Sequence, residues 1–414
     1  MLEILHWFCV VVMAVSGVYG LYQAYISLHM FGSFKPPRPA ADKTNRFAVL
    51  ICAKNEESVI GQLLDSLHKQ NYPPEAFDIF VTADNCTDRT AAVAKAGGAI
   101  VYERFDPAHK GKGYALNWFF EQFLGQYADR YEACIIFDAD NVVDKEFLAA
   151  MNRQLNAGHP VATGFRMGKN PSSSWISGCS SLFWLMQTRC FYIPRARLNL
   201  PCCSVGGTGF MFALSVLGGR GWHTYSVCED IEFTLNSIAD GHFIAFAPDA
   251  VFYDEQPLTF LQSLKQRYRW SLGSFQILTI STPRLFRAFR SGKPRIFDAL
   301  LYSLGVAITG VTSLCWFILI FVDAAIAHSW TSLPGTFAVA MAGGYLSVAL
   351  FAWLVLILEK KSWTGAWKSV LTFPIFLVSW AAINIFIFFY RNAVWHDIPH
   401  TESLGIEEME KKSL

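Results

Sequence analysis

The chain has 414 residues, of which 53% are hydrophobic and 16% charged, and its formal net charge is +1. A soluble globular chain usually carries about 25% charged residues, and this composition excludes a disordered protein and a coiled coil. The length excludes a small disulfide-stapled module, and the ten scattered cysteines form no C-x-x-C pair or zinc-like spacing. Because the net charge is near zero, no nucleic acid partner is expected.

Four stretches of the chain contain no Asp, Glu, Lys or Arg. They are residues 4–34, 299–322, 324–358 and 369–390, with lengths of 31, 24, 35 and 22 residues. A membrane-spanning helix needs about 20 mostly apolar residues, so each stretch is long enough to cross a bilayer. The sequence predicts a multi-pass protein of the cell membrane, with one transmembrane helix at 4–30 and about three more at 297–390. Whether the last stretch crosses completely stays open.

The region 35–256 carries most of the charge and alternates short β-rich runs with helical patterns. The β-rich runs are 46–52, 77–83, 99–103 and 133–138. This alternation predicts an α/β domain with a mostly parallel central sheet and helices on both faces. Ligands of such sheets bind at the carboxyl ends of the strands.

Lysines and arginines near the hydrophobic stretches predict the orientation in the membrane. Four of them lie from Lys35 to Arg46, residues 323–334 contain none, and residues 359–368 contain three lysines. The N-terminus is therefore expected outside the cell and the α/β domain in the cytoplasm. The composition of the tail, residues 391–414, does not decide on which side it lies.

Acidic side chains occur at the expected strand ends and at one helix start. Asp84 follows the second β-rich run, Asp138 and Asp140 follow the fourth, and Glu229 and Asp230 open a helix. Two carboxylates at i and i+2 can place oxygens on one hard cation, which commonly also holds substrate phosphates. An EF-hand is excluded because a valine occupies a ligand position and no glycine follows at the turn. For each acid alone, helix capping is the alternative.

Two basic segments suit phosphate groups. Lys110 and Lys112 stand with two glycines directly before a helical pattern, which is a weak phosphate-binding signal and not a Walker loop. In the amphipathic region 257–296, Gln266, Arg269 and Trp270 fall on one helix face. Arg269 could pair with a diphosphate and Trp270 could stack on a sugar ring. The alternative is a helix that only lies at the membrane interface.

Six short motifs occur in an order that resembles a known family. They are CAKNEE (52–57), DNCTD (84–88), DAD (138–140), GGTGF (206–210), CED (228–230) and QRYRW (266–270). In this set the chain resembles the membrane-embedded, processive family-2 glycosyltransferases, which are the hyaluronan, chitin, cellulose and poly-N-acetylglucosamine synthases. Lys54 stands where the family often has an aromatic residue, and Cys228 stands where cellulose synthases usually have threonine.

The resemblance implies a GT-A-type nucleotide-sugar-binding domain at 35–256, flanked by transmembrane helices, and a role for each motif residue. Asp138 and Asp140 would hold the nucleotide and a Mg²⁺ or Mn²⁺ ion, with Asp140 the more direct metal ligand. Asp230 would be the general base of the motif that includes Glu229. The remaining implied contacts are Ala53, Glu56 and Asp84 to the uridine, Lys112 to the diphosphate, Gly209 and Phe210 to the acceptor, and Gln266, Arg269 and Trp270 to the diphosphate and acceptor sugar.

The implied activity is an inverting transfer of sugar from a UDP-sugar, either UDP-N-acetylglucosamine or UDP-glucose, to the growing end of a β-linked polysaccharide. The alternative is a single addition to a lipid or lipid-linked acceptor. A channel or binding protein whose α/β domain only senses a nucleotide is a third hypothesis. It is disfavoured because sensing does not need a general base such as Asp230.

Overall fold

The computed structural model describes residues 1–35, 43–202, 204–326, 333–391 and 405–407. Its centre is an eight-stranded sheet with the strand order β3-β2-β1-β4-β7-β6-β8-β5. Strands β5 and β7 are antiparallel to their neighbours, and the other six strands run in one direction. The expectation of an α/β domain with a mostly parallel sheet is thus confirmed. The strands are β1 Phe47–Ala53, β2 Phe77–Asp84, β3 Ile100–Arg104, β4 Ala133–Asp138, β5 Val142–Val143, β6 Val161–Gly168, β7 Phe210–Ala213 and β8 Ile244–Asp254.

The four strands expected from the sequence agree with β1 to β4 to within about one residue at most boundaries. Strands β1 and β4 are buried over nearly their whole length, because helices cover both faces of a parallel sheet and such strands are apolar on both sides. The sequence patterns did not predict β5 to β8. These strands extend the sheet on the β4 side and bring further side chains to its edge.

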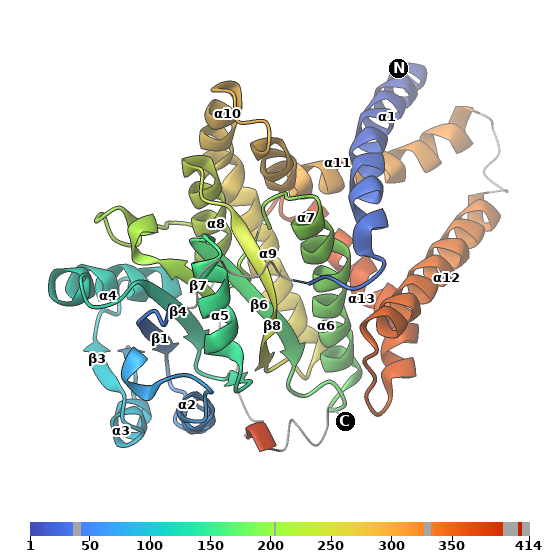
Figure 1. Cartoon of the computed structure of the whole chain (residues 1–414). Coiled ribbons are helices and arrows are strands. Elements are labelled where there is room, and N and C mark those ends of the chain that lie inside the picture. The colour runs from blue at the N-terminus through green and yellow to red at the C-terminus, as the bar shows by residue number, and fades with distance from the viewer. Residues whose placement is uncertain (36–42, 203, 327–332, 392–404, 408–414) are drawn as a thin grey trace.

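Helices cover both faces of the sheet (Figure 1). On one face lie α2 Ile60–His68, α3 Thr90–Ala96 and α5 Phe147–Asn156. On the other face lie α4 Lys112–Tyr127, α6 Trp175–Met186 and α8 Glu229–Asp240, over a core rich in phenylalanine. The short helical turns η1 Leu28–Met30, η2 Pro74–Ala76 and η4 Leu214–Leu217 lie in connections.

A further layer of helices joins this domain to the hydrophobic helices. It consists of the π-helical turn η3 Gln187–Tyr192, α7 Ile193–Arg197, α9 Phe260–Ile280 and α10 Thr282–Arg290. Helix α9 begins at a capping box in which Thr259 and Gln262 exchange hydrogen bonds. Helix α9, which carries QRYRW, therefore begins shortly after the end of β8.

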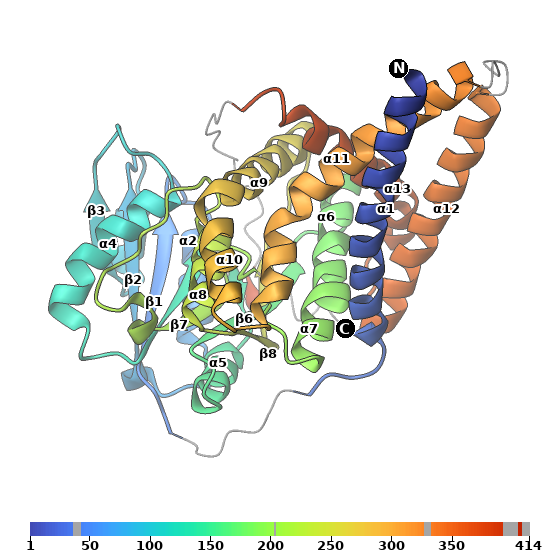
Figure 2. The same ribbon diagram turned by 90° about the horizontal axis from the view of Figure 1, so that it is seen from above.

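The hydrophobic helices are α1 Leu2–Ser27, α11 Ile296–Ile326, α12 Leu333–Glu359 and α13 Ala366–Phe386. All four are long and apolar enough to cross a membrane. Helices α1 and α11 lie side by side (Figures 1 and 2). Tyr22 hydrogen-bonds to Asp298 at 3.0 Å, and Thr312 hydrogen-bonds to Ser16 at 2.7 Å, so the two helices run in opposite directions. The chain is a multi-pass membrane protein with an α/β domain on one side of its hydrophobic helices.

Candidate active site

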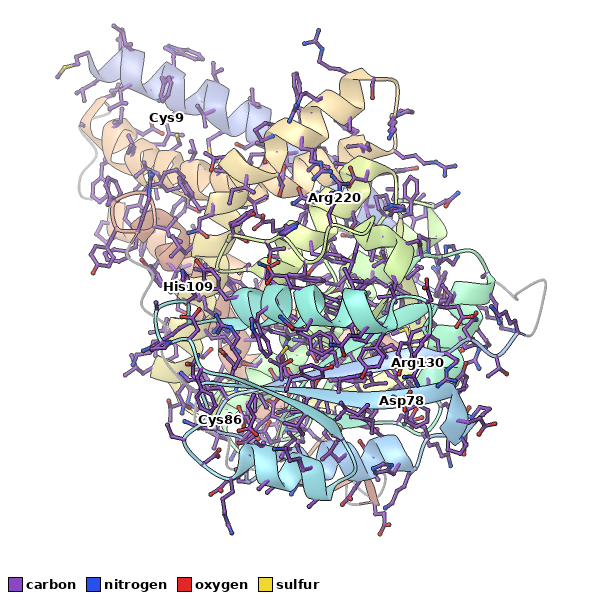
Figure 3. The ribbon with its side chains drawn as sticks, turned by 90° about the vertical axis from the view of Figure 1, so that its left-hand side faces the viewer. Cys9, Asp78, Cys86, His109, Arg130 and Arg220 are labelled. Carbon is purple, nitrogen blue, oxygen red and sulfur yellow. The ribbon has the colours of Figure 1, made fainter. Side chains whose placement is uncertain are left out.

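A cavity of about 750 Å³ lies at the carboxyl ends of β1, β2, β4 and β8, next to α8 and α9. Figure 3 shows this end of the sheet, where Cys86 and His109 lie on loops, while Asp78 and Arg130 lie at the opposite end. Eleven of the thirteen residues expected to form the site line the cavity. They are Ala53, Glu56, Asp84, Lys112, Asp138, Asp140, Glu229, Asp230, Gln266, Arg269 and Trp270.

Asp84 lies at the end of β2 and is fixed by a buried ion pair. Arg104 Nη1 donates to Asp84 Oδ1 at 2.6 Å, and Asn85 Nδ2 donates to the same oxygen at 2.9 Å. Burial raises the pKa of Asp84, and the Arg104 guanidinium opposes this shift. The sequence patterns did not single out Arg104, which holds Asp84 in place from the neighbouring strand β3.

Lys112 joins the two loops that carry DAD and GGTGF. Its Nζ contacts Asp138 Oδ1 and donates to the carbonyl oxygen of Gly207 at 2.6 Å. Burial acts to lower the pKa of Lys112, but the negative charges of Asp138 and Glu229 outweigh burial, so the pKa is raised. Lys112 is therefore a fixed cation within the cavity.

Asp254, at the end of β8, is a third carboxylate beside the DAD motif. Asn141 Nδ2 bridges the two segments, since it donates to Asp254 Oδ1 at 2.9 Å and to Asp140 Oδ1 at 3.2 Å. Burial raises the pKa of Asp254 to about 6, although Arg166 opposes the shift; Asp140 and Asp138 add to it. Asp254 ends an apolar run, as Asp138 does, and that pattern could have found it.

The carboxylates at the ends of β4 and β8 suit a divalent cation that also binds a ligand. Within the described residues, no group of three or more His, Cys, Asp or Glu side chains is placed to hold a metal ion. Asp138 and Asp140 nevertheless supply carboxylate oxygens at the cavity, and the mutual repulsion of the carboxylates favours a cation. Oxygens of a bound diphosphate would complete the coordination, as is usual for Mg²⁺.

Glu229 and Asp230 begin α8 and face the cavity. Burial raises the pKa of Glu229 to about 7; the neighbouring charge of Asp230 adds to the shift and Lys112 opposes it. Burial also raises the pKa of Asp230, against the opposing charges of Lys112 and Arg166. A β-carbon added to Gly207 would lie 3.5 Å from Asp230 Oδ2, so the glycine loop passes directly beside this carboxylate.

Helix α9 brings QRYRW to the same cavity. Gly273 of α9 packs on the N-terminus of α8 so closely that an added β-carbon would lie 2.6 Å from Cys228 Cβ. Arg269 and Trp270, one turn earlier, therefore face the cavity beside Glu229. The Trp270 ring lies 5.7 Å from Trp184 and 5.8 Å from Trp380 between centroids. The cavity end nearest the hydrophobic helices is thus aromatic.

Arg166 of β6 also lines the cavity and was not singled out by any sequence motif. Its guanidinium contacts the carbonyl oxygen of Gly206, lies 3.5 Å from Asp254 Oδ2, and stacks 3.9 Å from the Trp184 ring centroid. A single arginine within a strand gives no sequence signal, because only the fold brings it between the carboxylates and the glycine loop.

Gly209 and Phe210 do not line the cavity; Gly206 and Gly207 of the same motif do. Gly209 has a φ of 65°, and an added β-carbon would lie 2.2 Å from the Phe252 ring, so glycine is required there. Phe210 begins β7 and is buried in the core beside Phe212 and Trp222. Their expected contact with an acceptor stays a prediction.

The fold and the cavity define a membrane protein whose α/β domain is GT-A-like. Residues 45–273, more than half of the chain, match the family described as glycosyltransferase like family 2, and the chain belongs to this family.

Three curated relatives that are similar to this chain have different names. A probable glycosyltransferase of Bacillus subtilis is 28% identical over 263 residues, covering 61% of this chain and 60% of the relative. A beta-monoglucosyldiacylglycerol synthase of Synechocystis is 24% identical (55% and 47% covered). A poly-beta-1,6-N-acetyl-D-glucosamine synthase of Staphylococcus epidermidis is 25% identical (64% and 65% covered). The chain spans between about half and two thirds of the length of these relatives.

Among solved structures, the chain resembles a mannosyltransferase from Pyrobaculum calidifontis that was determined in complex with GDP-Man and Mn²⁺. The TM-score is 0.62 at 17% identity, and the alignment covers 93% of this chain and 99% of the mannosyltransferase. At this identity the likeness shows a shared fold. It extends over the hydrophobic helices as well as the α/β domain.

Proposed function

We propose that the protein is an inverting, metal-dependent glycosyltransferase that transfers a hexose from a UDP-sugar to an acceptor at the cytoplasmic face of the cell membrane. The observation that carries the proposal is the joint placement of Lys112, Arg269 and Asp230 in one cavity, next to the DAD carboxylates. These groups provide the cations for a diphosphate and a base for an acceptor hydroxyl.

The donor half of the cavity suits a nucleoside diphosphate. Asp84 and Glu56 would accept hydrogen bonds from the base and ribose, beside the backbone of Ala53. Lys112 and Arg269 would neutralise the diphosphate, and Asp138 and Asp140 would hold Mg²⁺ or Mn²⁺. The bound ion would supply charge neutralisation of the leaving diphosphate. The Mn²⁺ and GDP-Man in the mannosyltransferase of the same fold support this assignment.

The acceptor half of the cavity provides the base. The acceptor oxygen would attack the anomeric carbon as the bond from that carbon to the diphosphate oxygen breaks, and Asp230 would take the hydroxyl proton. UDP leaves with the bonding electron pair. A single displacement inverts the anomeric centre, so an α-linked donor gives a β-linked product.

The proposed acceptor is the growing end of a β-glycan, and the transfer is proposed to be processive. The aromatic end of the cavity supports a sugar acceptor, because Trp270 and Trp380 line it and sugars stack on such rings. The second candidate is a single addition to a lipid or lipid-linked acceptor. It is favoured by the relative named beta-monoglucosyldiacylglycerol synthase and by Tyr302 of α11, which brings a hydrophobic helix to the cavity.

The test is to incubate membranes containing the protein with a panel of UDP-sugars and to measure released UDP. UDP-N-acetylglucosamine or UDP-glucose should be consumed, EDTA should abolish transfer, and Mn²⁺ or Mg²⁺ should restore it. Asp140→Asn should weaken metal-dependent donor binding while leaving the fold intact. Transfer at the full rate in excess chelator would remove the metal from the mechanism, and no turnover with any donor would favour a nucleotide sensor.

The product distinguishes the two acceptors. A ladder of long, water-soluble glycan on a gel would support polysaccharide elongation. A single labelled species that partitions into organic solvent would show lipid glycosylation instead.

A further inference from the structure

Helix α13 is long and apolar enough to cross a membrane, yet its first turns pack on the α/β domain. Cys179 Sγ of α6 lies 3.6 Å from the carbonyl oxygen of Ser369. Gly178 contacts the same residue so closely that an added β-carbon would lie 2.0 Å from Ser369 Oγ. Helix α6 itself packs on strand β6. The start of α13 is thus on the domain side of the hydrophobic helices.

The middle and the end of α13 lie along α9, which carries the cavity residues of QRYRW. Arg267 Nη1 donates to the carbonyl oxygen of Phe376 at 2.7 Å and to Ser379 Oγ at 2.8 Å. Further along both helices, Ser271 Oγ donates to Asn384 Oδ1 at 2.7 Å. Because the contacts advance together, α9 and α13 run side by side in the same direction.

The residues directly after α13 remain on α9. Tyr268 donates its hydroxyl to the carbonyl oxygen of Tyr390 at 3.2 Å, and the Arg391 guanidinium lies 4.5 Å from the Phe275 ring centroid. Both ends of α13 therefore contact helices that belong to the α/β domain or pack on it. Figures 1 and 2 show α13 behind α6 and beside α9, whereas α12 extends away from the domain.

A buried charge argues against a transmembrane position for this helix pair. Arg267 is fully buried between α9 and α13, halfway along α13. If α13 crossed the bilayer, this guanidinium would lie at the depth of the hydrocarbon core, where an arginine is costly. At the membrane surface the same guanidinium lies between the domain and the lipid.

The two faces of α13 have different chemistry. The face toward α6 and α9 carries the polar groups of Ser369, Ser379 and Asn384. The opposite face is an exposed apolar stripe at helical spacing, made of Trp367, Leu371, Ile375, Val378 and Phe386. This stripe is the part of α13 that is open to lipid.

The described part of the tail lies on the α/β domain. Ile406 packs with Val142 and Tyr253, which neighbour the DAD loop and Asp254, and Glu407 Oε1 lies 2.9 Å from Lys69 Nζ. Helix α12 also ends on the domain side, because Glu359 pairs with Arg189 of η3 at 2.5 Å. With α12 ending there and the tail returning there, α13 has no need to cross.

From these contacts we infer that α13 does not span the membrane. It lies in the surface of the leaflet next to the α/β domain, with its exposed apolar stripe in the lipid and its buried face on α6 and α9. The crossing helices are α1, α11 and α12, and residues 405–407 lie on the same side as the cavity. A lipid-bound helix thus supplies Trp380 to the cavity wall. The inference does not depend on the proposed function.

The first test is the depth of nitroxide labels in vesicles, read by collision with oxygen and with a water-soluble relaxer. Labels replace Leu371, Val378 and Phe386 on α13, with Leu346, Trp353 and Ile357 on α12 as the matched set. Leu371 and Phe386 are separated by about 22 Å along the helix axis, and Leu346 and Ile357 by about 16 Å. The α13 labels should share one shallow depth while the α12 labels change depth steadily. A steady change along α13 would overturn the inference.

The second test keeps the native cysteines. A fluorescent protein or alkaline phosphatase is fused after Leu414, and each is also fused after Lys361, between α12 and α13, as the reference. The reporter at Leu414 should behave as the reporter at Lys361 does, because both positions lie on one side. Opposite reporter activities at the two positions would show that α13 crosses.

Discussion

Lys112 determines much of the charge balance in the cavity. It contacts Asp138 and Gly207 directly, and its positive charge opposes the burial that raises the pKa values of Glu229 and Asp230. One lysine therefore keeps Asp138 in place and helps the proposed base to ionise. Such a role depends on burial, since the same charge in water would be screened.

At this scale, Asp230→Asn should separate chemistry from binding. The amide keeps the size of the side chain but cannot take a proton at neutral pH, so turnover should fall by about 10²–10⁴. UDP-sugar affinity should change little, because Asp230 is proposed to face the acceptor. Turnover and donor binding are measured on the same preparation.

Arg269→Ala is the comparison for Asp230→Asn, and it should lower both transfer and donor affinity because it removes a diphosphate contact. If Asp230 only favoured the start of α8 electrostatically, Asp230→Asn would cost about 0.3–1 kcal/mol of stability and leave turnover per folded molecule unchanged. Near-normal turnover in Asp230→Asn would mean that another group is the base.

The raised pKa values of Glu229 and Asp230 predict the pH dependence of transfer. A base must be ionised, so kcat/KM should fall as the pH drops through the raised pKa values of this coupled pair. Because the pKa of Glu229 is raised to about 7, the decline should begin near neutral pH and not near pH 4, where a solvated carboxylate titrates. A pH–rate profile checks this, and a rate that stays constant down to about pH 5 would contradict it.

At the scale of helices, the contact between α8 and α9 sets the distance between the proposed base and Arg269. Gly273 makes this contact possible, because an added β-carbon would lie 2.4 Å from Cys228 Sγ and 2.9 Å from Cys228 N. The latter atom is backbone and cannot rotate away. The glycine is needed here for close approach, since its φ is not in the left-handed region.

Gly273→Ala should therefore push the N-terminus of α8 away from α9 and lower kcat. The matched control is Gly61→Ala in α2, where nothing lies within 4 Å of the added β-carbon and the change should be neutral or stabilising by up to about 1 kcal/mol. Steady-state kinetics and thermal unfolding of both variants are the measurements. Equal activity of the two variants would show that the spacing of α8 and α9 does not limit transfer.

At the scale of the whole molecule, buried ion pairs fix the α/β domain to the hydrophobic helices. The side chains of Arg195 and Asp298 are fully buried, with Nε 2.8 Å from Oδ2, and Tyr22 of α1 also donates to Asp298. One carboxylate thus connects α7, α11 and α1. The orientation of the domain on the membrane helices depends on this junction.

Asp298→Ala should leave the Arg195 charge buried without this carboxylate and cost about 3–5 kcal/mol. The exposed pair of Lys95 and Glu103, at 2.7 Å, is the control, and Glu103→Gln should change stability by no more than about 1 kcal/mol. Thermal unfolding in detergent measures both. Similar melting temperatures for the two variants would argue against a structural role for the buried pair.

The orientation across the membrane is a second prediction at this scale. In a background without native cysteines, cysteines at Asp42 and Lys361 should be protected from an impermeant reagent in intact cells, whereas one at Ser329 should be labelled. The physical reason is the asymmetry of lysine and arginine around the hydrophobic stretches. Labelling at Asp42 in intact cells would reverse the topology and place the α/β domain outside.

The sequence by itself determined the hydrophobic helices, the strands β1 to β4 and most of the cavity. Runs without charge and the alternation of strands and helices are local properties, so they can be seen without a fold. Short motifs between Ala53 and Trp270 supplied the expected site residues, and eleven of these residues line one cavity.

Only the tertiary structure decided the rest. Arg166 and Asp254 reach the cavity, and Arg104 reaches Asp84 at its edge, because neighbouring strands pair across long sequence separations. Gly209 and Phe210 belong to a motif, yet the packing of Phe252 and the core of β7 keep them out of the cavity lining. Composition makes α13 resemble a transmembrane helix, whereas its contacts with α6 and α9 determine where it lies. The hydrophobicity of a helix determines that it is removed from water. Its packing partners determine whether it crosses the membrane or lies at the membrane surface.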